Sequence, residues 1–350
     1  MKERTVSLGE GAGGELMQSM LKELVLPLVR TGAKETGTGI PASLLDDSAT
    51  VGDAAFTIDG HTVWPLEFPG GDIGSLSVYG TVNDLCAVGA RPEALALSLV
   101  IEEGMEKELL KRISASIGSA ADRSGVTIVT GDTKVVEKGG VKGMIATTAG
   151  LGWKHPLLDD NLYKAGREPG WLRDDSLRSG DSLILTGPVG DHGISLLSFR
   201  EGYGFETEVV SDLAPMVEVM DRVLGAGGVV AAKDLTRGGV ANALNEWSSK
   251  NNLSLNVVEE KIPVREPVRS ACDLLGLDPF EIGNEGKMIL AVAPGFEDAV
   301  LSALRSCPMS KDSEIIGTVL NKKGPVVLET VVGGRRIMDP PHGDPVPRIC

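Results

Sequence analysis

The sequence predicts an α/β (or α+β) protein of two domains, and two observations support this. Strand-like and helix-like segments alternate through both halves of the chain, as in folds that layer sheets against helices. A length of 350 residues exceeds what one hydrophobic core usually organises, so two domains of roughly 150 to 200 residues are expected. With 42% hydrophobic and 24% charged residues, the chain has the composition of an ordinary globular protein.

In the first half, the glycine-rich run Gly9–Gly14 precedes a helix predicted over Leu16–Leu28, where apolar residues recur every three or four positions. The same period is clearest in a second helix, predicted over Glu106–Ser124. The other elements predicted in this half are a helix at Ser75–Val88 and strands at Thr57–Val63, Ala94–Ile101, Val126–Thr130 and Val141–Leu151.

The stretch Trp153–Ser179 is polar and contains Gly and Pro, which predicts a linker or surface insertion. Alternation then resumes, with strands predicted at Asp181–Thr186, Val229–Ala232, Leu253–Val258, Met288–Val292, Ser313–Leu320 and Pro325–Val332 and helices at Gly193–Ser198, Met216–Gly225, Gly239–Ser249, Val264–Leu275 and Phe296–Ser306. After Met338 four prolines rule out regular structure, so we expect an extended, mobile tail that ends at Cys350.

Charge and cysteine content exclude several classes of protein. A net charge of −15 argues against nucleic acid as a partner, because neutralising phosphates requires clustered Lys and Arg. The N-terminus has no apolar signal core, and no stretch approaches the ~20 apolar residues that a membrane span needs, so a cytoplasmic location is expected. The cysteines lack CxxC spacing, and Cys86, Cys272 and Cys307 are predicted to be buried, inert thiols.

Aspartates recur in one setting, at turns next to apolar strands. They are Asp46, Asp47, Asp59, Asp84, Asp132 and Asp234. Any one of them alone fits a turn-forming residue, because Asp caps helices and makes Asx turns. Their recurrence indicates a Mg²⁺–nucleotide site, since hard cations take oxygen ligands.

Backbone groups offer further candidates for binding phosphate. Gly11, Gly13 and Gly14 leave backbone N–H groups open to an oxyanion, although the run lacks the Lys-Ser/Thr of a P-loop and simple turn flexibility is an equal interpretation. Arg237 and Gly238 stand at the start of a predicted helix, whose N-terminus favours phosphate.

Two charged side chains are candidates for the chemistry itself. Glu285 lies between glycine-containing turns before a strand, which fits either a buried general base or a hairpin turn. Lys134 follows Asp132 and could face a polyphosphate or a developing anion, or be solvated. The four histidines show no ligand spacing and are predicted to be structural or solvated: His61, His155, His192 and His342.

Taken together, these motifs resemble the HypE family of hydrogenase maturation proteins, in the superfamily that includes aminoimidazole ribonucleotide synthetase and selenophosphate synthetase. The matching segments are Gly11–Gly14, Asp46–Ala49, Phe68–Gly74, Gly80–Leu85, Gly89–Pro92, Gly131–Val136, Asp234–Val240, Asn284–Gly286 and Pro347–Cys350. They extend over nearly the whole chain. The terminal Pro-Arg-Ile-Cys is what resembles the HypE family in particular.

The resemblance implies an ATP-dependent carbamoyl dehydratase. A carbamoyltransferase, HypF, would load a carbamoyl group onto the sulfur of Cys350, and ATP would drive its dehydration to a thiocyanate. The nitrile would pass to iron on a HypC–HypD scaffold and become a cyanide ligand of [NiFe]-hydrogenase. Glu285 would act as base and Lys134 would assist. The remaining assignments are Gly11, Gly13, Gly14, Asp59, Asn83, Arg237 and Gly238 for ATP, and Asp46, Asp47, Asp84, Asp132 and Asp234 for Mg²⁺.

The fold implied by the resemblance is the two-domain type of aminoimidazole ribonucleotide synthetase, with mixed sheets, helices packed outside, and a homodimer whose N-terminal domains share a barrel. Expected boundaries are 1–40 for the glycine-rich segment and helix, 41–152 for the ATP-binding domain, 153–337 for the C-terminal α/β domain and 338–350 for the tail. Two rivals stay open: an ATP enzyme of the same fold with a free substrate, and a non-catalytic scaffold with a docking tail.

Overall fold

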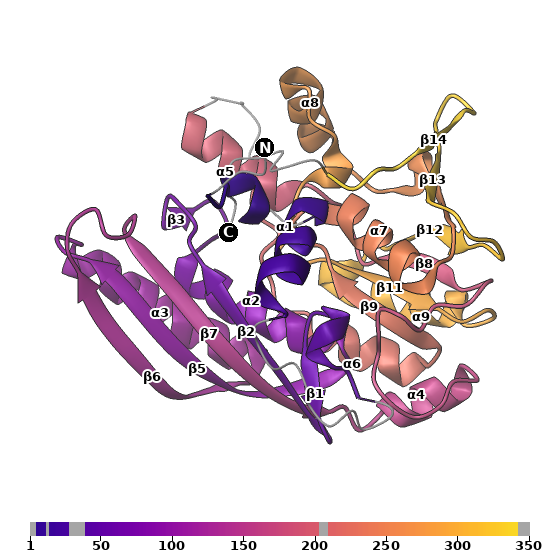
Figure 1. Ribbon diagram of the computed structural model, residues 1–350, viewed down its shortest axis with the longest axis horizontal. Coiled ribbons are helices and arrows are strands. Elements are labelled where there is room, and N and C mark those ends of the chain that lie inside the picture. Colours follow the sequence, from indigo (N-terminus) through magenta and orange to yellow (C-terminus); the bar gives the residue numbers. More distant parts are fainter. Residues whose placement is uncertain (1–4, 12–13, 28–38, 203–208, 342–350) are drawn as a thin grey trace.

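Two mixed β-sheets with helices against them make up the fold in this computed structural model, which describes residues 5–11, 14–27, 39–202 and 209–341 (Figure 1). Strands and helices alternate through both halves, so the predicted α/β class is confirmed, as are the mixed sheets. Most elements begin and end within a few residues of their predicted bounds; β11, for example, runs over Met288–Val292 as expected.

The first sheet has five strands in the order β1-β2-β7-β5-β6. They are β1 (Ala49–Val51), β2 (Ala54–His61), β7 (Met144–Lys154), β5 (Ala90–Glu102) and β6 (Thr127–Val136). Only β5 and β6 run parallel, and the crossover that this pairing requires is helix α3 (Lys107–Ser124). Helices α2 (Ile73–Ala87) and α3 pack against one face, while Phe56, Ile58 and Trp153 on the opposite face are exposed.

The second sheet has seven strands in the order β14-β13-β10-β12-β8-β11-β9. Its strands are β8 (Ser182–Leu185), β9 (Val229–Asp234), β10 (Leu255–Val258), β11, β12 (Glu314–Val319), β13 (Val326–Glu329) and β14 (Arg335–Ile337). The helices of this half are α4 (Leu158–Lys164), α5 (Asp191–Glu201), α6 (Val217–Ala226), α7 (Gly239–Asn251), α8 (Glu266–Leu275) and α9 (Glu297–Arg305). A small hairpin, β3 (Glu67–Phe68) and β4 (Gly71–Asp72), precedes α2.

Helix α2 joins the two halves. It contacts β2, β5 and β7 of the first sheet and also α6 and the edge strand β9 of the second half. It is apolar on nearly all sides, as a fully enclosed helix must be, and Asp84 is its one residue that is not buried. Asp72 and Ser75 form a reciprocal capping box that fixes its start. One continuous hydrophobic core therefore extends from the first sheet into the second.

Helix α1 (Gly14–Met20) continues into a π-helical turn at Leu21–Val25, and together they lie between the two halves (Figure 1). The predicted helix thus begins two residues earlier than expected, and its predicted end at Leu28 lies outside the described residues. The Gln18 amide donates a hydrogen bond to Glu246 of α7 at 3.2 Å, which ties this segment to the second half.

The segment Trp153–Ser179 is not the polar linker or surface insertion that its composition suggested. It contains α4, whose Leu158 and Leu162 are buried, and Trp171 and Leu172 join the same core. The Asp174 side chain is fully buried. The prediction failed because the apolar residues here are spaced too irregularly to produce a periodic pattern, although Leu158, Leu162, Trp171 and Leu172 are part of the core.

Three aspartates predicted at turns lie inside regular elements instead. Asp59 is within β2 and Asp84 is within α2. Strand β6 continues six residues past its predicted end at Thr130, so Asp132 is mid-strand, as is Lys134. Gly131 caused the error, because glycine usually ends a strand; here a Cβ at this position would lie 2.5 Å from the Leu97 carbonyl oxygen on β5.

Domain boundaries at residues 40, 152 and 337 stay predictions, because a shared core offers no clear division. Cys86, Cys272 and Cys307 are buried free thiols, as predicted. Among the described helices, none combines the length and the apolar character needed to cross a bilayer.

A buried acid at the start of α5 predicts a pH-dependent stability. Asp191 is 1% exposed, and its carboxylate oxygens accept no hydrogen bond from a described residue, although Arg265 lies 3.4 Å away. Burial raises its pKa to about 6. A carboxyl group whose pKa is raised on folding stabilises the fold fully below the unfolded value near 3.8, and this stabilisation is lost as the pH rises through about 6. Asn does not titrate, so the free energy of unfolding of Asp191→Asn relative to wild type should increase by on the order of 2–3 kcal/mol between pH 4 and pH 7. Urea unfolding across that range measures it, and a gain that does not change with pH would contradict it.

Candidate active site: an acidic cavity between the two halves

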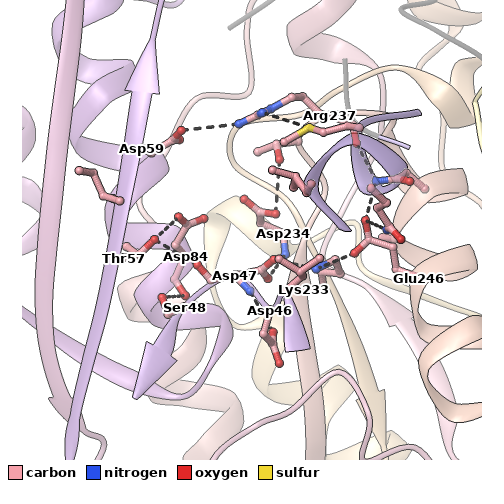
Figure 2. Close-up of a pocket in the computed structure, with 18 of the residues that line it drawn as sticks. Asp46, Asp47, Ser48, Thr57, Asp59, Asp84, Lys233, Asp234, Arg237 and Glu246 are labelled. Carbon is pink, nitrogen blue, oxygen red and sulfur yellow. Dashed lines mark hydrogen bonds and ion pairs between the residues drawn. The ribbon is translucent and has the colours of Figure 1, made fainter. Parts of the chain in front are cut away.

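A cavity of about 670 Å³ opens where the two halves and α1 meet (Figure 2). Its walls come from α1, the loop before β1, β2, α2, the end of β9, α7 and the turn at Glu285. The carboxylates that line it are Asp46, Asp47, Asp59, Asp84, Asp234, Glu246 and Glu285. The fully charged cations among the lining residues are Lys233 and Arg237. The cavity is therefore strongly acidic.

Asp46 and Asp47 face the cavity from the loop before β1. The Lys233 ammonium, on β9, lies 2.7 Å from the carboxylate of Asp47 and is itself buried. Burial raises the pKa of Asp46 well above its usual range, and the neighbouring carboxylates of Asp174 and Asp47 raise it further. Lys233 also contacts Asp174 and Glu246, so its ammonium donors are directed at carboxylates. Lys233 offsets part of the negative charge, and its three donors all have carboxylate partners.

Asp84 and Asp234 face each other from α2 and the end of β9 (Figure 2). Burial raises the pKa of Asp84 well above its usual range, with repulsion from Asp234 and Asp59 adding to it, and Thr57 donates a hydrogen bond to Asp84 at 2.9 Å. Burial and the charge of Asp47 raise the pKa of Asp234 to about 8. Like charges held this close favour either bound protons or a bound cation.

Asp59 behaves differently because it has cationic partners. Burial opposes ionisation, but His61 at 3.1 Å and Arg237 at 3.6 Å lower the Asp59 pKa below its ordinary value. His61 lines the cavity from β2 and is 2% exposed. His61 was predicted to be structural or solvated, and its burial beside Asp59 is consistent with a structural role. Its place at the cavity wall was not foreseen, because a lone histidine on a strand carries no spacing signal.

Glu285 contributes a buried carboxylate that no described residue hydrogen-bonds. Burial raises its pKa well above the usual range, and Asp234, Asp59 and Asp212 add to the effect. Its backbone is held firmly: the Glu285 amide donates to Asp212 at 3.0 Å, and its carbonyl accepts from Asn83 at 3.1 Å. A fixed, unpartnered carboxylate of high proton affinity at a cavity wall has the properties of a general base.

The cavity also has apolar lining residues, which include Met17, Leu21, Pro41, Ala42, Leu45, Phe56 and Ile58. A lining of both carboxylates and apolar side chains suits a ligand that joins a planar apolar group to a phosphate–metal group. Within the described residues no three His, Cys, Asp or Glu side chains are arranged as a ready-made metal cage.

The structure brings together most of the residues predicted for this site. Lining the cavity are Gly11, Gly14, Asp46, Asp47, Asp59, Asp84, Asp234, Arg237 and Glu285. Gly238 lies just behind the wall, at a φ of 77°. Gly13 and Cys350 lie outside the described residues. Lys233 and Glu246 were not predicted, because a lysine before Asp and a glutamate within a helix look like surface residues in the sequence.

Besides Gly238, three predicted residues do not reach the cavity in one chain. Asp132 and Lys134 lie on β6, at the far edge of the first sheet, with their side chains 64% and 71% exposed. Asn83 is buried behind the wall, where its amide donates to the carbonyls of Ala214 and Glu285 and accepts from the Met216 amide. Asn83 therefore holds the backbone of Glu285 and does not line the cavity in one chain, and its assignment to the nucleotide stays a prediction.

Comparison with known proteins identifies the class. Residues 45–153 match the N-terminal domain of the AIR synthase related proteins and residues 178–329 match their C-terminal domain, so the chain belongs to that family. It is 45% identical over 345 residues to a putative hydrogenase expression/formation protein of Methanocaldococcus jannaschii, covering 97% of this chain and 98% of the relative. It is 42% identical to the carbamoyl dehydratase HypE of Bradyrhizobium diazoefficiens, covering 99% and 96%. Within the family, the chain is a member of the HypE group.

Solved structures agree with this placement. A HypE–HypF complex matches with a TM-score of 0.82 at 36% identity, covering 94% of this chain and all of the other. A hydrogenase maturation protein HypE in complex with ATP matches with a TM-score of 0.79 at 38% identity, covering 99% of this chain and all of the other. The fold expected from the resemblance to aminoimidazole ribonucleotide synthetase is thereby confirmed.

The contacts of Asn83 predict a stability effect without a binding effect. Asn83→Ala leaves two buried carbonyls and one amide without partners, which we expect to lower the free energy of unfolding by about 1–3 kcal/mol or more. Urea denaturation measures the loss, with the half-buried Asn256→Ala on β10 as control. ATP affinity of the folded variant should match wild type. A weakened affinity would return Asn83 to the nucleotide site.

Proposed function

We propose that this chain is an ATP-dependent carbamoyl dehydratase that works on a carboxamide carried by its own Cys350. The reaction converts a protein S-carboxamide to a thiocyanate, with ADP and phosphate as the other products. The nitrile then becomes a cyanide ligand of [NiFe]-hydrogenase. Family membership supports this proposal, and one feature of the chain's own geometry carries it.

That feature is the place where the described chain ends. Met338 is buried and its carbonyl accepts a hydrogen bond from Asn245 of α7. Pro341 is buried against Gly14 and Gly238: a Cβ on Gly14 would lie 3.0 Å from the Pro341 carbonyl oxygen. Gly14 lines the cavity, and residues 342–350 follow. Those residues can span at most roughly 30 Å, so a thiol at position 350 is tethered within reach of the cavity.

The cavity suits ATP in both size and polarity. About 670 Å³ lies in the usual range for small-molecule sites. The apolar lining residues Leu21, Pro41 and Ile58 fit the adenine, and the carboxylates fit a metal-bound triphosphate. Gly11 and Gly14 line the cavity beside α1, and the Arg237 guanidinium lies 4.0 Å from the Met17 sulfur of the same helix, so backbone N–H groups and a guanidinium are available to phosphate oxygens.

The carboxylates that line the cavity are suited to bind Mg²⁺. Asp46, Asp47, Asp84 and Asp234 would hold it, because burial and mutual repulsion leave these carboxylates with high proton affinity until a cation compensates them. Mg²⁺ usually takes one or two carboxylates together with substrate phosphates, so a complete protein cage is not required. When bound, it would neutralise charge on the transferring phosphoryl group.

Dehydration of the carboxamide needs two groups from the protein. The amide oxygen is a poor leaving group until it takes the γ-phosphoryl group of ATP. As it does so, the nitrogen releases one of its two protons to water, which gives an S–C(=NH)–O–phosphate and ADP. Glu285 then takes the remaining proton from nitrogen while the C–O bond breaks, leaving S–C≡N and phosphate. The high proton affinity of Glu285 and its unpartnered carboxylate suit this step. Arg237, beside the same wall, favours the departing phosphate.

A homodimer is part of this proposal. Lys134 and Asp132 share the open face of the first sheet with Ile58 and Phe56, as the strand register requires. Phe56 and Ile58 also line the cavity, so a second copy packed on this face would cover the cavity mouth. In a symmetric pair, Lys134 and Asp132 of one subunit would complete the site of the other, where Lys134 assists at the amide or phosphate and Asp132 at the metal.

Partners follow from the same reaction. The carbamoyl group requires a carbamoyltransferase, and the HypE–HypF complex supports HypF in that role for this chain. A HypC–HypD complex would accept the nitrile. We assign the protein to the cytoplasm, which suits its free thiols at Cys86, Cys272 and Cys307.

Intact-protein mass spectrometry tests the reaction directly. Carbamoylated protein should lose the mass of one water on addition of Mg²⁺ and ATP, because the carboxamide oxygen leaves as phosphate. Cys350→Ala should bind ATP as wild type does and take no carbamoyl group, and Cys307→Ala provides the matched thiol control. A carbamoylated mass that ATP leaves unchanged would refute the proposed function.

Mixing two inactive variants tests the composite site. Lys134→Ala and Glu285→Gln should each abolish dehydration, since each removes one group from every site. A mixed dimer has one site that keeps both residues, so remixing the subunits should restore about a quarter of the wild-type rate. Ile58→Asp, which places a charge on the open face, should prevent restoration and give a monomer in light scattering. If remixing restores nothing although mixed dimers form, Lys134 does not act across the interface.

A further inference from the structure

Asp174 is a fully buried charge that lies outside the cavity and contacts several of the groups around it. The Asp174 carboxylate accepts hydrogen bonds from the Trp247 indole at 2.6 Å, from Lys250 at 2.5 Å and from Lys233 at 3.1 Å. Its backbone amide donates to the carboxylate of Asp46 at 3.0 Å. Asp174 thus joins α7 and β9 to the loop that carries the cavity aspartates.

Both lysines reach from Asp174 to that loop. Lys233 contacts Asp47 at 2.7 Å, and Lys250 donates to the Leu45 carbonyl at 2.7 Å. Lys250 does not line the cavity. Asp46, Asp47 and Leu45 are therefore each held by Asp174 either directly or through one lysine.

Leu45 has a backbone that needs such support. It lies in the left-handed region at φ 53° and ψ 49°, where residues with a side chain are strained. Strained residues of this kind persist only where the surroundings fix them. The turn at Leu45 sets the direction in which Asp46 and Asp47 leave the preceding 3-10 turn, Ala42–Leu44, so a relaxed turn would redirect both carboxylates.

We propose that Asp174 is a positioning residue for metal–nucleotide binding: through Lys250 and Lys233 it holds the strained turn at Leu45 and so directs Asp46 and Asp47 into the cavity. The choice of Mg²⁺–ATP as ligand in this inference rests on the proposed function. The contacts that hold the turn belong to the protein alone and do not depend on that function.

A matched buried acid separates positioning from simple stability. Asp181 is as buried as Asp174, pairs with Arg167 at 2.7 Å, and makes no contact with the cavity. Removing one partner from either buried pair is expected to destabilise the fold, because the remaining charge loses its compensation. Only the change at Asp174 should also alter the loop at 42–48.

The experiment compares Asp174→Asn, Lys250→Met and Asp181→Asn with wild type, at a temperature where each is folded. Without any ligand, amide hydrogen exchange in residues 42–48 should be faster in the first two variants and unchanged in Asp181→Asn. With Mg²⁺–ATP, calorimetric titration should show a Kd about ten- to a hundredfold higher in the first two, the usual effect of losing a residue that orients metal ligands. If Asp174→Asn does not fold, Lys250→Met carries the test.

A rescue variant checks the role of the turn. Asn adopts the left-handed conformation more readily than Leu. The double variant Lys250→Met/Leu45→Asn should therefore exchange slowly again in residues 42–48, and it should bind Mg²⁺–ATP as tightly as Leu45→Asn alone. Unchanged exchange in both Asp174→Asn and Lys250→Met would overturn the inference, as would equal effects in Asp181→Asn or failure of the rescue. If wild type does not bind Mg²⁺–ATP, the proposed function fails, and the exchange measurements still decide the inference.

Discussion

The repulsion among carboxylates in one cavity is the constraint on which the rest of the structure depends. Seven line the cavity, against one lysine and one arginine. Burial removes the water that would screen them, so each raises the cost of ionising its neighbours. A protein keeps such an arrangement only if its fold prevents the groups from moving apart. The buried lysine at position 233, the Asp174 contacts and the enclosed helix α2 supply that restraint.

The acidic residues come from different elements, and the topology explains how they meet. Asp84 projects from the one position of α2 that is not buried, Asp59 from β2, and Asp234 from the end of β9. Since α2 packs between β2 and β9, this position faces the space where these strands approach each other. Asn83, the preceding residue on α2, is directed to the other side and holds the backbone at Glu285. One turn of helix thus positions both a carboxylate and the base.

The sequence predicted the elements well, and it predicted the cavity residues that have a local signal. Periodic apolar residues identified α3, a continuous apolar run identified β11, and the setting of aspartates at turns next to apolar strands identified Asp46 and Asp234. Contacts between distant segments have no local signal, so the roles of Lys233 and Asp174 were not foreseen. The polar composition of 153–179 concealed a segment in which a few large apolar side chains are buried. Asp132 and Lys134 were identified as functional by their motif alone, and one chain does not bring them to the cavity.

The burial of α2 from both sides also limits how the protein can be dissected. A fragment that begins after β7 would lack α2 and would expose the apolar edge strand β9, which α2 covers in the intact chain. Exposed apolar edge strands pair with one another, so such a truncation would aggregate when expressed. The complementary fragment would leave the Asn83 side chain and the second-sheet face of α2 uncovered. The two halves are in this sense a single folding unit, even though their sheets look separate along the chain.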